Sequence, residues 1–395
     1  MADLKRCVVC DSADLIALAS IKEVPIHCNV LSDTKEAALG AAKAPLELVF
    51  CKNCGHIYNA DFDPGLMAYH GHYENALHYS PHFQRYADSV ADRLITRYNV
   101  HKGTIIEIGS GGGEFLDLMC RKGQNTGIGF DPSQADAPET AQFDNVSIVP
   151  DFFSGKYADT KGDFVVSRHV LEHIEYPRDF AKLILGAAKS DATRFYIEVP
   201  NGTYTLATDM IWDLIYEHCS YFTQGSLVRL LESTGYAIIE AGNSYDGQFL
   251  YAEAEIARPG AVGRQPRSQN TEDLSRLAER FSQLYQSTVK RWNEQLSHWR
   301  DSGQTVILWG AGSKGSMFMN SVRACNGYIQ YVVDVNPRKE GRFVAGGGQQ
   351  IIPPDRLKEI NPDIILIMNP IYRDEISRTV SELGLSAKVD CISTE

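Results

Sequence analysis

The sequence predicts an α/β protein in three parts, a small cysteine-bearing module followed by two units of alternating strands and helices. Three observations support this fold class. Two Cys-x-x-Cys pairs occur near the N-terminus, with little regular apolar periodicity around them. Short apolar stretches alternate with amphipathic ones over residues 103–256, and again from residue 304 onward. Each of these two units opens on an apolar strand that runs into glycines.

The predicted boundaries follow these changes of pattern. The cysteine module spans residues 1–65. The first α/β unit spans residues 66–256 and begins with helices, of which Phe83 to Tyr98 carries apolar side chains on one face. Residues 257–302 are expected to be a linker with a polar amphipathic helix, and residues 303–395 form the second unit. The two units look like separate domains rather than copies.

The composition argues against two classes of partner. The formal net charge is −12 and no long basic run occurs, whereas nucleic acid or an anionic membrane would need a basic footprint. No apolar run reaches the roughly 20 residues of a membrane span. The N-terminal segment lacks the apolar core of a signal peptide. We therefore expect a cytoplasmic protein with reduced thiols and a small-molecule substrate, and the oligomeric state stays open.

A metal site is predicted in the N-terminal module. Its ligands are Cys7, Cys10, Cys51 and Cys54. Two such pairs bring four thiolates to the corners of a tetrahedron, the geometry that zinc prefers. A closed site of four sulfurs leaves no position for water, so the zinc would be structural. The alternatives are four free thiols, or replacement of one ligand by Cys28 or His56.

A cofactor site is predicted where the first α/β unit begins. An apolar strand over residues 104–108 is followed by Gly109, Gly111 and Gly113 before a helix starts. Glycines let the backbone turn sharply and pass close to a ligand at a helix N-terminus. Asp131 ends the next strand, where an acidic side chain binds ribose hydroxyls. Taken alone, this pattern also fits a dinucleotide-binding domain.

Three further features favour S-adenosylmethionine (SAM). Glu107 lies inside the strand end, which gives Glu-x-Gly-x-Gly-x-Gly. Asp151 and Phe152 follow the third strand, where they are expected to bind the adenine amino group and cover its ring. The segment DFVVSRHVLEHI resembles the fourth strand and next helix of a class I methyltransferase, with His169 expected at the cofactor. This unit is therefore predicted to be a class I, Rossmann-like methyltransferase domain.

Nearly the whole chain resembles one known family, the bacterial sugar C-methyltransferases, which act on nucleotide-linked keto-deoxysugars. The resemblance rests on the paired cysteine motifs with PIHCNV between them, the SAM-type glycines, EVP followed by YEHCSYFT, and a C-terminal half with GAGSKG, VVDVNPRKEGRF, IIPP and NPIYRDEI. It implies an N-terminal zinc domain, a SAM-binding middle domain and a Rossmann-like C-terminal domain that helps hold the nucleotide-sugar. It also implies a histidine base that removes a proton beside a ketone, after which the enolate attacks the SAM methyl group.

The resemblance also assigns roles to residues of this chain. The base falls on His218, with Glu217 beside it and Tyr216 just before, and His173 is a second candidate for contacting the sugar. An active-site tyrosine of the family is matched by Tyr73 or Tyr79.

Three departures from the family bear on the acceptor more than on the reaction class. The stretch before the base is one residue shorter than in the family and lacks its first histidine. The family's glycine-serine-arginine turn is replaced by DGQFL at residues 246–250, and GGGQQI stands where the family has a bulkier loop.

The residue types in this stretch fit the implied chemistry. A carbon becomes nucleophilic only after deprotonation, and histidine suits that task near neutral pH. Glu217 is expected to fix the tautomer of His218, and tyrosine hydroxyls such as that of Tyr221 to donate to the enolate oxygen. Two alternatives stay open: a histidine in a packed aromatic cluster, or a metal between His169 and His173 on one helix face.

A second glycine motif opens the C-terminal unit. Gly310, Gly312 and Gly315 follow an apolar strand, and Asp334 ends the next strand. Alone this motif indicates a dinucleotide, whereas the resemblance implies docking of a nucleotide-sugar. Lys314 is suitably placed to meet a pyrophosphate. Arg342 is a further candidate contact, and a pure packing role is the alternative.

The leading hypothesis is a SAM-dependent enzyme that methylates carbon on a nucleotide-linked deoxysugar. A second hypothesis is O- or N-methylation of another small acceptor, for which positioning matters more than a strong base. A third is a nucleotide-binding regulatory protein that has lost catalysis. The intact glycines and Asp131 argue against the third.

Overall fold

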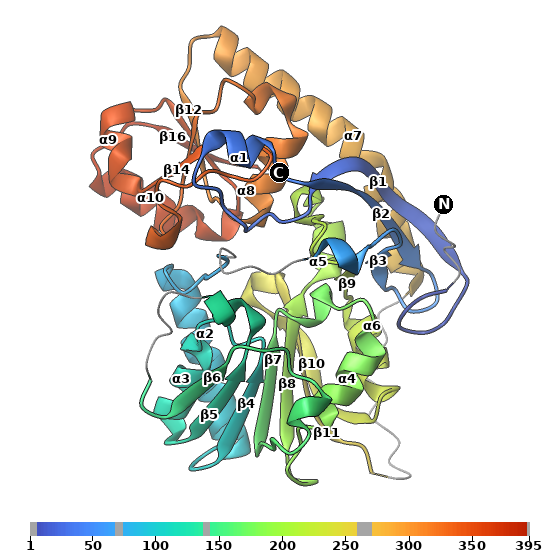
Figure 1. Cartoon of the computed structure of the whole chain (residues 1–395). Helices are drawn as coiled ribbons and strands as arrows, with labels where there is room; N and C mark the ends of the chain where they lie inside the picture. Colours follow the sequence, from blue (N-terminus) through green and yellow to red (C-terminus); the bar gives the residue numbers. More distant parts are fainter. Residues whose placement is uncertain (1–5, 68–73, 137–142, 259–270, 393–395) are drawn as a thin grey trace.

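A computed structural model describes residues 6–67, 74–136, 143–258 and 271–392 (Figure 1). Three β-sheets organise the chain, and helices pack against them. In Figure 1, the N-terminal strands and the C-terminal unit lie side by side above the large central sheet. The predicted α/β class with an N-terminal module and two α/β units is confirmed.

The central sheet has seven strands in the order β10-β11-β8-β7-β4-β5-β6. Their bounds are Thr104–Ile108 (β4), Thr126–Phe130 (β5), Val146–Val149 (β6), Phe164–Arg168 (β7), Arg194–Pro200 (β8), Tyr236–Ser244 (β10) and Phe249–Ile256 (β11). Strands β4 to β8 run parallel, and β11 is antiparallel to β8. The chain lays β5 and β6 on one side of β4 and then crosses to β7 on the other. Ligands bind at such a switch point, beyond the carboxyl ends of the strands.

Helices cover both faces of this sheet because its parallel strands are apolar on both sides. They are Pro81–Tyr98 (α2), Glu114–Gly123 (α3), Pro177–Leu185 (α4) and Gln224–Glu232 (α6). Ile105 packs in one cluster with α2 and α3, whereas its neighbour Ile106 packs in another with α4 and α6. Ser80 caps the helix predicted over Phe83 to Tyr98, because its hydroxyl accepts the N–H of Phe83 at 3.3 Å.

The segment after β7 differs from the helix that its sequence resembles. It forms a single 3₁₀ turn, Leu171–His173, and α4 begins only at Pro177. His169 lies in the left-handed region with φ of 56°, which takes the backbone out of helical geometry. His169 and His173 are therefore not one turn apart on a helix face, and the metal pair considered for them loses its geometric basis.

The N-terminal sheet has four strands in the order β1-β2-β3-β9. Their bounds are Leu15–Pro25 (β1), Lys43–Cys51 (β2), Ile57–Asn59 (β3) and Ser220–Tyr221 (β9). The fourth strand comes from the middle of the chain, so a boundary at residue 65 separates this sheet from one of its strands. Helix α1 (Lys35–Leu39) reaches the C-terminal unit, where the N–H of Gly346 donates to the carbonyl of Ala38 at 2.7 Å.

The C-terminal sheet is fully parallel, with strand order β14-β13-β12-β15-β16. Its strands are Val306–Trp309 (β12), Tyr331–Val333 (β13), Gln350–Ile352 (β14), Ile364–Ile367 (β15) and Lys388–Cys391 (β16). Its helices are Ser313–Ser321 (α8), Leu357–Ile360 (α9) and Arg373–Glu382 (α10). The glycine motif lies between β12 and α8, at the switch point of this second sheet.

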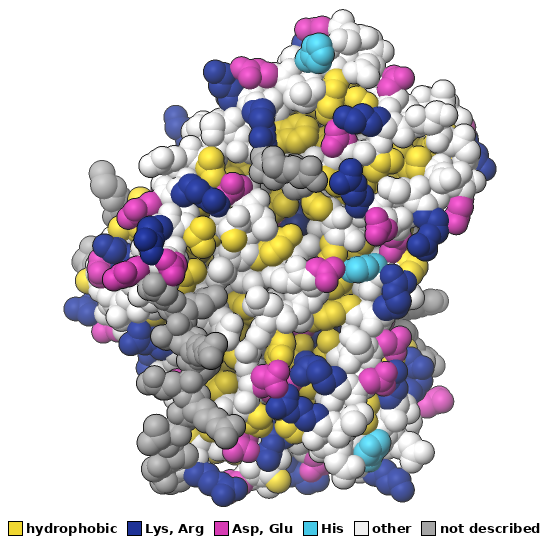
Figure 2. Space-filling model, turned by 180° about the vertical axis from the view of Figure 1, so that it is seen from behind, with side chains coloured by type: hydrophobic (Ala, Val, Ile, Leu, Met, Phe, Trp, Pro, Cys, Tyr) yellow, Lys and Arg dark blue, Asp and Glu magenta, His cyan; other side chains and the backbone are white. Residues whose placement is uncertain are grey.

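Helix α7 (Thr271–Asp301) connects the two α/β units and packs along the N-terminal sheet (Figure 1). Its buried face includes Leu274, Phe281, Trp292 and Leu296. The region predicted as a linker is thus a core helix from Thr271, while residues 259–270 lie outside the described residues. Within the described ranges, no helix is long and apolar enough to cross a membrane. On the face shown in Figure 2, charged side chains of both signs are interspersed.

Candidate active site

The four cysteines of the two N-terminal pairs meet in one cluster. The sulfurs of Cys7 and Cys54 are 3.6 Å apart, as are those of Cys10 and Cys51. All four sulfurs lie within 4.8 Å of one another. Sulfurs around a tetrahedral zinc ion, at bonds of about 2.3 Å, are about 3.8 Å apart, so the cluster has the size of a zinc site. The alternative ligand His56 turns its ring toward β9.

A cavity of about 900 Å³ opens at the carboxyl ends of β4, β5 and β7. Gly109 and Gly111 line it with φ of 77° and 54°, in the region that favours glycine. A Cβ atom on Gly109 would come within 2.0 Å of the Val170 side chain, so the turn after β4 has no room for a larger residue. Gly113 precedes α3 and lies beneath Ile148, outside the cavity lining.

Asp131 is held rigidly at this cavity. Its Oδ2 accepts the N–H of Gly111 at 2.7 Å, and its Oδ1 accepts the N–H of Ser133 at 2.9 Å. These two bonds fix the carboxylate across the glycine turn, where the sequence predicts the ribose of the cofactor.

Glu107 is a buried carboxyl group in the floor of the same cavity. It is 3% exposed, and its Oε2 has no hydrogen-bond partner among the described residues. Burial raises the pKa of Glu107 to about 8, against the opposing effect of the Arg168 guanidinium. A cationic ligand bound here would restore the charge of this group.

Asp151 and Phe152 are placed differently from each other. The Phe152 ring is 61% exposed and lines the cavity, as a residue that covers a cofactor ring would. The Asp151 carboxylate instead accepts hydrogen bonds from Lys156 Nζ at 2.9 Å and from the Tyr157 hydroxyl at 2.7 Å. Asp151 is not part of the cavity lining, in contrast to its expected contact with adenine.

His169 forms part of the wall between this cavity and a second one. Its Nε2 is 3.1 Å from a carboxylate oxygen of Glu198, and its Nδ1 is 3.6 Å from one of Glu172. Burial lowers the pKa of His169, but the two carboxylates outweigh burial and raise it to about 9. The ring is therefore positively charged near neutral pH.

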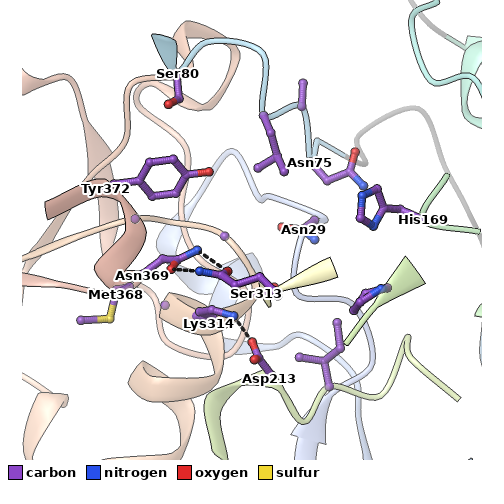
Figure 3. Close-up of a pocket in the computed structure, with 18 of the residues that line it drawn as sticks. Asn29, Asn75, Ser80, His169, Asp213, Ser313, Lys314, Met368, Asn369 and Tyr372 are labelled. Atoms are coloured by element: carbon purple, nitrogen blue, oxygen red, sulfur yellow. Dashed lines mark hydrogen bonds and ion pairs between the residues drawn. The ribbon is translucent and has the colours of Figure 1, made fainter. Parts of the chain in front are cut away.

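The second cavity, of about 290 Å³, lies between the central sheet and the C-terminal unit (Figure 3). The glycine turn of the C-terminal unit lines one side, with Lys314 paired to Asp213 of the middle domain. His169, His173 and His218 line the other side. His169 and His173 line both cavities and therefore stand between the two spaces.

The rings of His173 and His218 meet edge to face, with centroids 4.8 Å apart. His173 Nδ1 is 2.9 Å from the carbonyl oxygen of Glu217, and a carbonyl only accepts, so this nitrogen carries the hydrogen. Burial, together with the electrostatic effect of His173, His169 and Lys314 nearby, holds the pKa of His218 well below its usual range. A lowered pKa favours the neutral imidazole, the form that accepts a proton.

Two residues expected beside His218 face the N-terminal module instead. The Glu217 carboxylate accepts the N–H of Cys28 at 3.2 Å and lies 3.5 Å from Nδ1 of His27. The Tyr216 hydroxyl accepts the N–H of Asp63 at 2.9 Å. Neither residue lines the second cavity, in contrast to the expectation that Glu217 fixes the tautomer of His218. The chain makes a turn at Tyr216 and Glu217, and both side chains point away from the cavity that His218 lines.

The remaining tyrosine candidates differ in their positions and in the bonding of their hydroxyls. Tyr221 lines the cavity, but its hydroxyl donates to the carbonyl of Ile215 at 3.0 Å and accepts the N–H of the same residue at 2.8 Å. Tyr79 also lines the cavity, and burial raises its pKa, so its hydroxyl stays protonated. Tyr73 lies outside the described residues.

The C-terminal glycine turn repeats the geometry of the SAM-type turn. Asp334 Oδ2 accepts the N–H of Ala311 at 3.0 Å, as Asp131 does with Gly111. Gly312 precedes α8 and lines the cavity with Lys314. Arg342 is bound elsewhere, 2.9 Å from an Asp33 carboxylate oxygen of the N-terminal module, and it does not line the cavity. Its expected contact with the nucleotide-sugar is not supported by this position.

Sequence reasoning missed contacts that join the middle domain to the C-terminal unit around this cavity. The amides of Gln248 and Asn369 bond reciprocally at 3.0 and 3.1 Å. The hydroxyls of Tyr245 and Tyr372 are 2.7 Å apart. Gln248 stands where the turn departs from the related family, and this departure was the available indication of a special role.

Comparison with known proteins agrees with this architecture. Residues 81–241 match a family model described as a methyltransferase domain, and residues 260–386 match one described as the C-methyltransferase C-terminal domain. The C-methyltransferase NovU of Streptomyces niveus is 25% identical over 397 residues, which cover 94% of this chain and 91% of that protein.

Two solved methyltransferases align with parts of the chain. The 1,6-didemethyltoxoflavin-N1-methyltransferase of Burkholderia thailandensis has a TM-score of 0.35 at 15% identity, over 44% of this chain and 79% of its own. The magnesium protoporphyrin IX methyltransferase of Synechocystis PCC 6803, with bound SAH, has a TM-score of 0.35 at 19% identity, over 45% and 84%. The two family matches and the relative that spans nearly the whole chain show that the protein is a SAM-dependent methyltransferase, and they support a bacterial C-methyltransferase family.

Proposed function

We propose that the enzyme transfers the methyl group of SAM to a carbon beside a ketone of a nucleotide-linked deoxysugar. The observation that carries the proposal is the position of His218. His218 lines a cavity that shares His169 and His173 with the cofactor cavity and is bounded on its other side by a nucleotide-type glycine turn. An O- or N-methyltransferase does not require a base to make carbon nucleophilic.

The cofactor cavity fits SAM on two observations. Gly111 lines the cavity with a φ of 54°, and no protein atom lies within 4 Å of where its Cβ would stand, which permits close approach of a ligand to the backbone. Glu107 supplies a buried carboxyl oxygen that lacks a partner among the described residues. When bound, SAM supplies an electrophilic methyl group. We assign the ribose hydroxyls to Asp131 and one face of the adenine to Phe152.

In the proposed reaction, a ring nitrogen of His218 takes the proton from the carbon beside the ketone. The electron pair of that C–H bond delocalises onto the ketone oxygen as an enolate. Tyr79 is the tyrosine of the cavity whose hydroxyl we assign to this oxygen, since the Tyr221 hydroxyl is already bonded to the backbone. His173 lies between the cofactor and the acceptor and holds its position through the Glu217 carbonyl.

The nucleotide of the acceptor is assigned to the C-terminal glycine turn. The backbone from Gly310 to Gly312 and the N-terminus of α8 suit a phosphate, and Lys314 adds a positive charge. Asp334 stands where a ribose-binding carboxylate stands in such sheets. Lys314 is paired with Asp213 in the structure, so phosphate binding would exchange one anionic partner for another.

We further assign a structural zinc ion to Cys7, Cys10, Cys51 and Cys54. The support is the spacing of the sulfurs and the soft-ligand preference of zinc. Four protein ligands complete the coordination, so this ion would take no part in methyl transfer.

The reaction class can be tested with an acceptor deuterated beside its ketone. The probes are 4-keto-6-deoxyhexoses linked to thymidine, uridine, guanosine or cytidine diphosphate. C-methylation replaces one deuterium by a methyl group, whereas O- or N-methylation replaces a hydrogen. The product mass should therefore rise by about 13 rather than about 14 mass units for at least one probe. A methylated product that keeps all its deuterium, or no product with any probe, would contradict the proposed function.

A further inference from the structure

Glu172 is a buried carboxylate that the proposed mechanism does not yet use. It lies in the 3₁₀ turn Leu171–His173, is 2% exposed and lines the acceptor cavity. Its Oε2 has no hydrogen-bond partner among the described residues. A buried carboxylate oxygen left in this state is costly unless another group compensates it. Glu172 lies beside His173 and His218, so a proton on the His218 ring could provide that compensation.

The distances connect Glu172 to the base. A carboxylate oxygen of Glu172 and one ring nitrogen each of His173 and His218 lie within 4.8 Å of one another. The carboxylate adjacent to His218 in sequence, Glu217, is turned away and bonded to Cys28. Glu172, 46 residues before His218 in the sequence, is therefore the carboxylate that faces the base.

We propose that Glu172 is the positioning residue of the base and stabilises the imidazolium that forms on His218. The inference rests on the proposed function. When the C–H bond beside the ketone breaks, its electron pair goes to the enolate and its proton to His218. Glu172 stays ionised, and its negative charge faces the new positive charge across the short distance between them.

The surrounding charges explain why such a partner is needed. His169 and Lys314 already add positive charge near His218, and His173 is its direct neighbour. The charge of Lys314 is balanced by Asp213, and His169 lies between Glu172 and Glu198, which also pairs with Arg168. A proton on His218 adds positive charge to a buried site, and the negative charge of Glu172 reduces the cost of that charge.

Two histidines and a carboxylate can also hold a metal ion. We assign this group to proton transfer, and the response to added Mn²⁺ distinguishes that role from a metal site.

The test compares Glu172→Gln and Glu172→Ala with Glu217→Gln in the full chain. Each protein is incubated in heavy water with S-adenosylhomocysteine and the four nucleoside diphosphate keto-deoxyhexoses, and exchange beside the ketone is followed by NMR. We expect both Glu172 variants to exchange about 10- to 100-fold more slowly than wild type, less than the loss of the base itself would cost. Glu217→Gln, which keeps an acceptor for the Cys28 N–H, should exchange at the wild-type rate.

Chemical rescue of Glu172→Ala distinguishes the loss of the Glu172 charge from a structural effect of the substitution. Formate fits the space left by Glu172→Ala and should raise the exchange rate of this variant several-fold, whereas chloride at equal ionic strength should not. A wild type that exchanges no probe would refute the proposed function itself. If the wild type exchanges but the Glu172 variants exchange at the wild-type rate, this inference alone would be overturned. It would also be overturned if added Mn²⁺ activated the wild type but not Glu172→Gln, because that would indicate a metal site.

Discussion

Tyr58 of β3 pairs with Ser220 of β9 across the antiparallel ladder that joins the cysteine module to the middle domain. Ser220 follows His218 by two residues, and Tyr58 follows Cys54 by four. The His56 ring packs against Phe222 on the same interface, with centroids 4.8 Å apart. The proposed zinc site therefore supports the strand that positions the proposed base.

The first prediction is that Cys51→Ser loses the metal and weakens the enzyme at a distance. Metal binding and folding are coupled in such modules, so the unfolding temperature should fall by about 5–10 °C. Methyl transfer should fall as well, because β3 would no longer hold β9. Elemental analysis should give one zinc per wild-type chain and less in the variant. The control is Cys391→Ser, outside the cluster, and a fully folded wild type without metal would contradict the assignment.

The second prediction separates the two acidic residues expected at the cofactor. Asp131→Ala should weaken SAM binding about 10- to 100-fold, the effect of losing hydrogen bonds to a charged acceptor. Asp151→Ala should change it much less, because that carboxylate is bonded to Lys156 and Tyr157. Calorimetry with SAM, and with NAD as the control ligand, gives both values. A larger loss for Asp151 than for Asp131 would show that Asp151 turns into the cavity.

The third prediction uses the raised pKa of Glu107. With a pKa of about 8 in the folded chain and about 4.3 when unfolded, this group binds a proton in the native state between those values. Unfolding then releases the proton, so the group's contribution to stability decreases as the pH rises from about 4.5 to 8. Glu107→Gln removes this dependence. The difference in unfolding temperature between this variant and wild type should therefore shift in favour of the variant as the pH rises from about 5 to about 8.

Glu107 also predicts the direction of proton transfer when the cofactor binds. The positive charge of SAM favours the ionised carboxylate, so binding near pH 7 should release up to about one proton from wild type. The Gln variant should release none from this site. Calorimetry in two buffers of different ionisation enthalpy measures the difference, and equal proton release from both proteins would show that Glu107 does not meet the cationic part of the cofactor.

Much of the fold could be predicted because its determinants are local. The strand, glycines and helix around Gly109 follow each other within a few residues, and Asp131 ends the next strand. The two cysteine pairs carry their spacing in the sequence. Periodicity and turn chemistry suffice for such features.

The rest depends on contacts between distant residues. Gln248 and Asn369 are 121 residues apart, and their pairing arises from domain packing. The direction of Glu217 could not be predicted because it lies in a turn without a helical or strand period. The 3₁₀ turn at Glu172 replaced an expected helix because His169 adopts a positive φ, which is uncommon outside glycine. These three differences all concern the acceptor site.

The last prediction concerns the base. His218→Ala should slow methyl transfer by about 10²–10⁴, the usual contribution of a general base. SAM affinity should change little, because His218 lines only the acceptor cavity, whereas His173 lines both. His173→Ala should therefore weaken SAM binding more than His218→Ala does. The exposed His101 provides the control, and His101→Ala should match wild type in both measurements.

Isotope exchange gives the decisive comparison between the two histidines. With S-adenosylhomocysteine in place of SAM, methyl transfer is blocked and only proton removal remains. In heavy water, wild type should exchange the proton beside the ketone of a nucleotide-linked keto-deoxyhexose, and His218→Ala should not. His173→Ala should keep measurable exchange, because its ring supports the site through the Glu217 carbonyl and the edge contact with His218. Undiminished exchange in His218→Ala, with its loss in His173→Ala, would assign the proton transfer to His173, whose hydrogen on Nδ1 leaves Nε2 as the basic nitrogen in its neutral form.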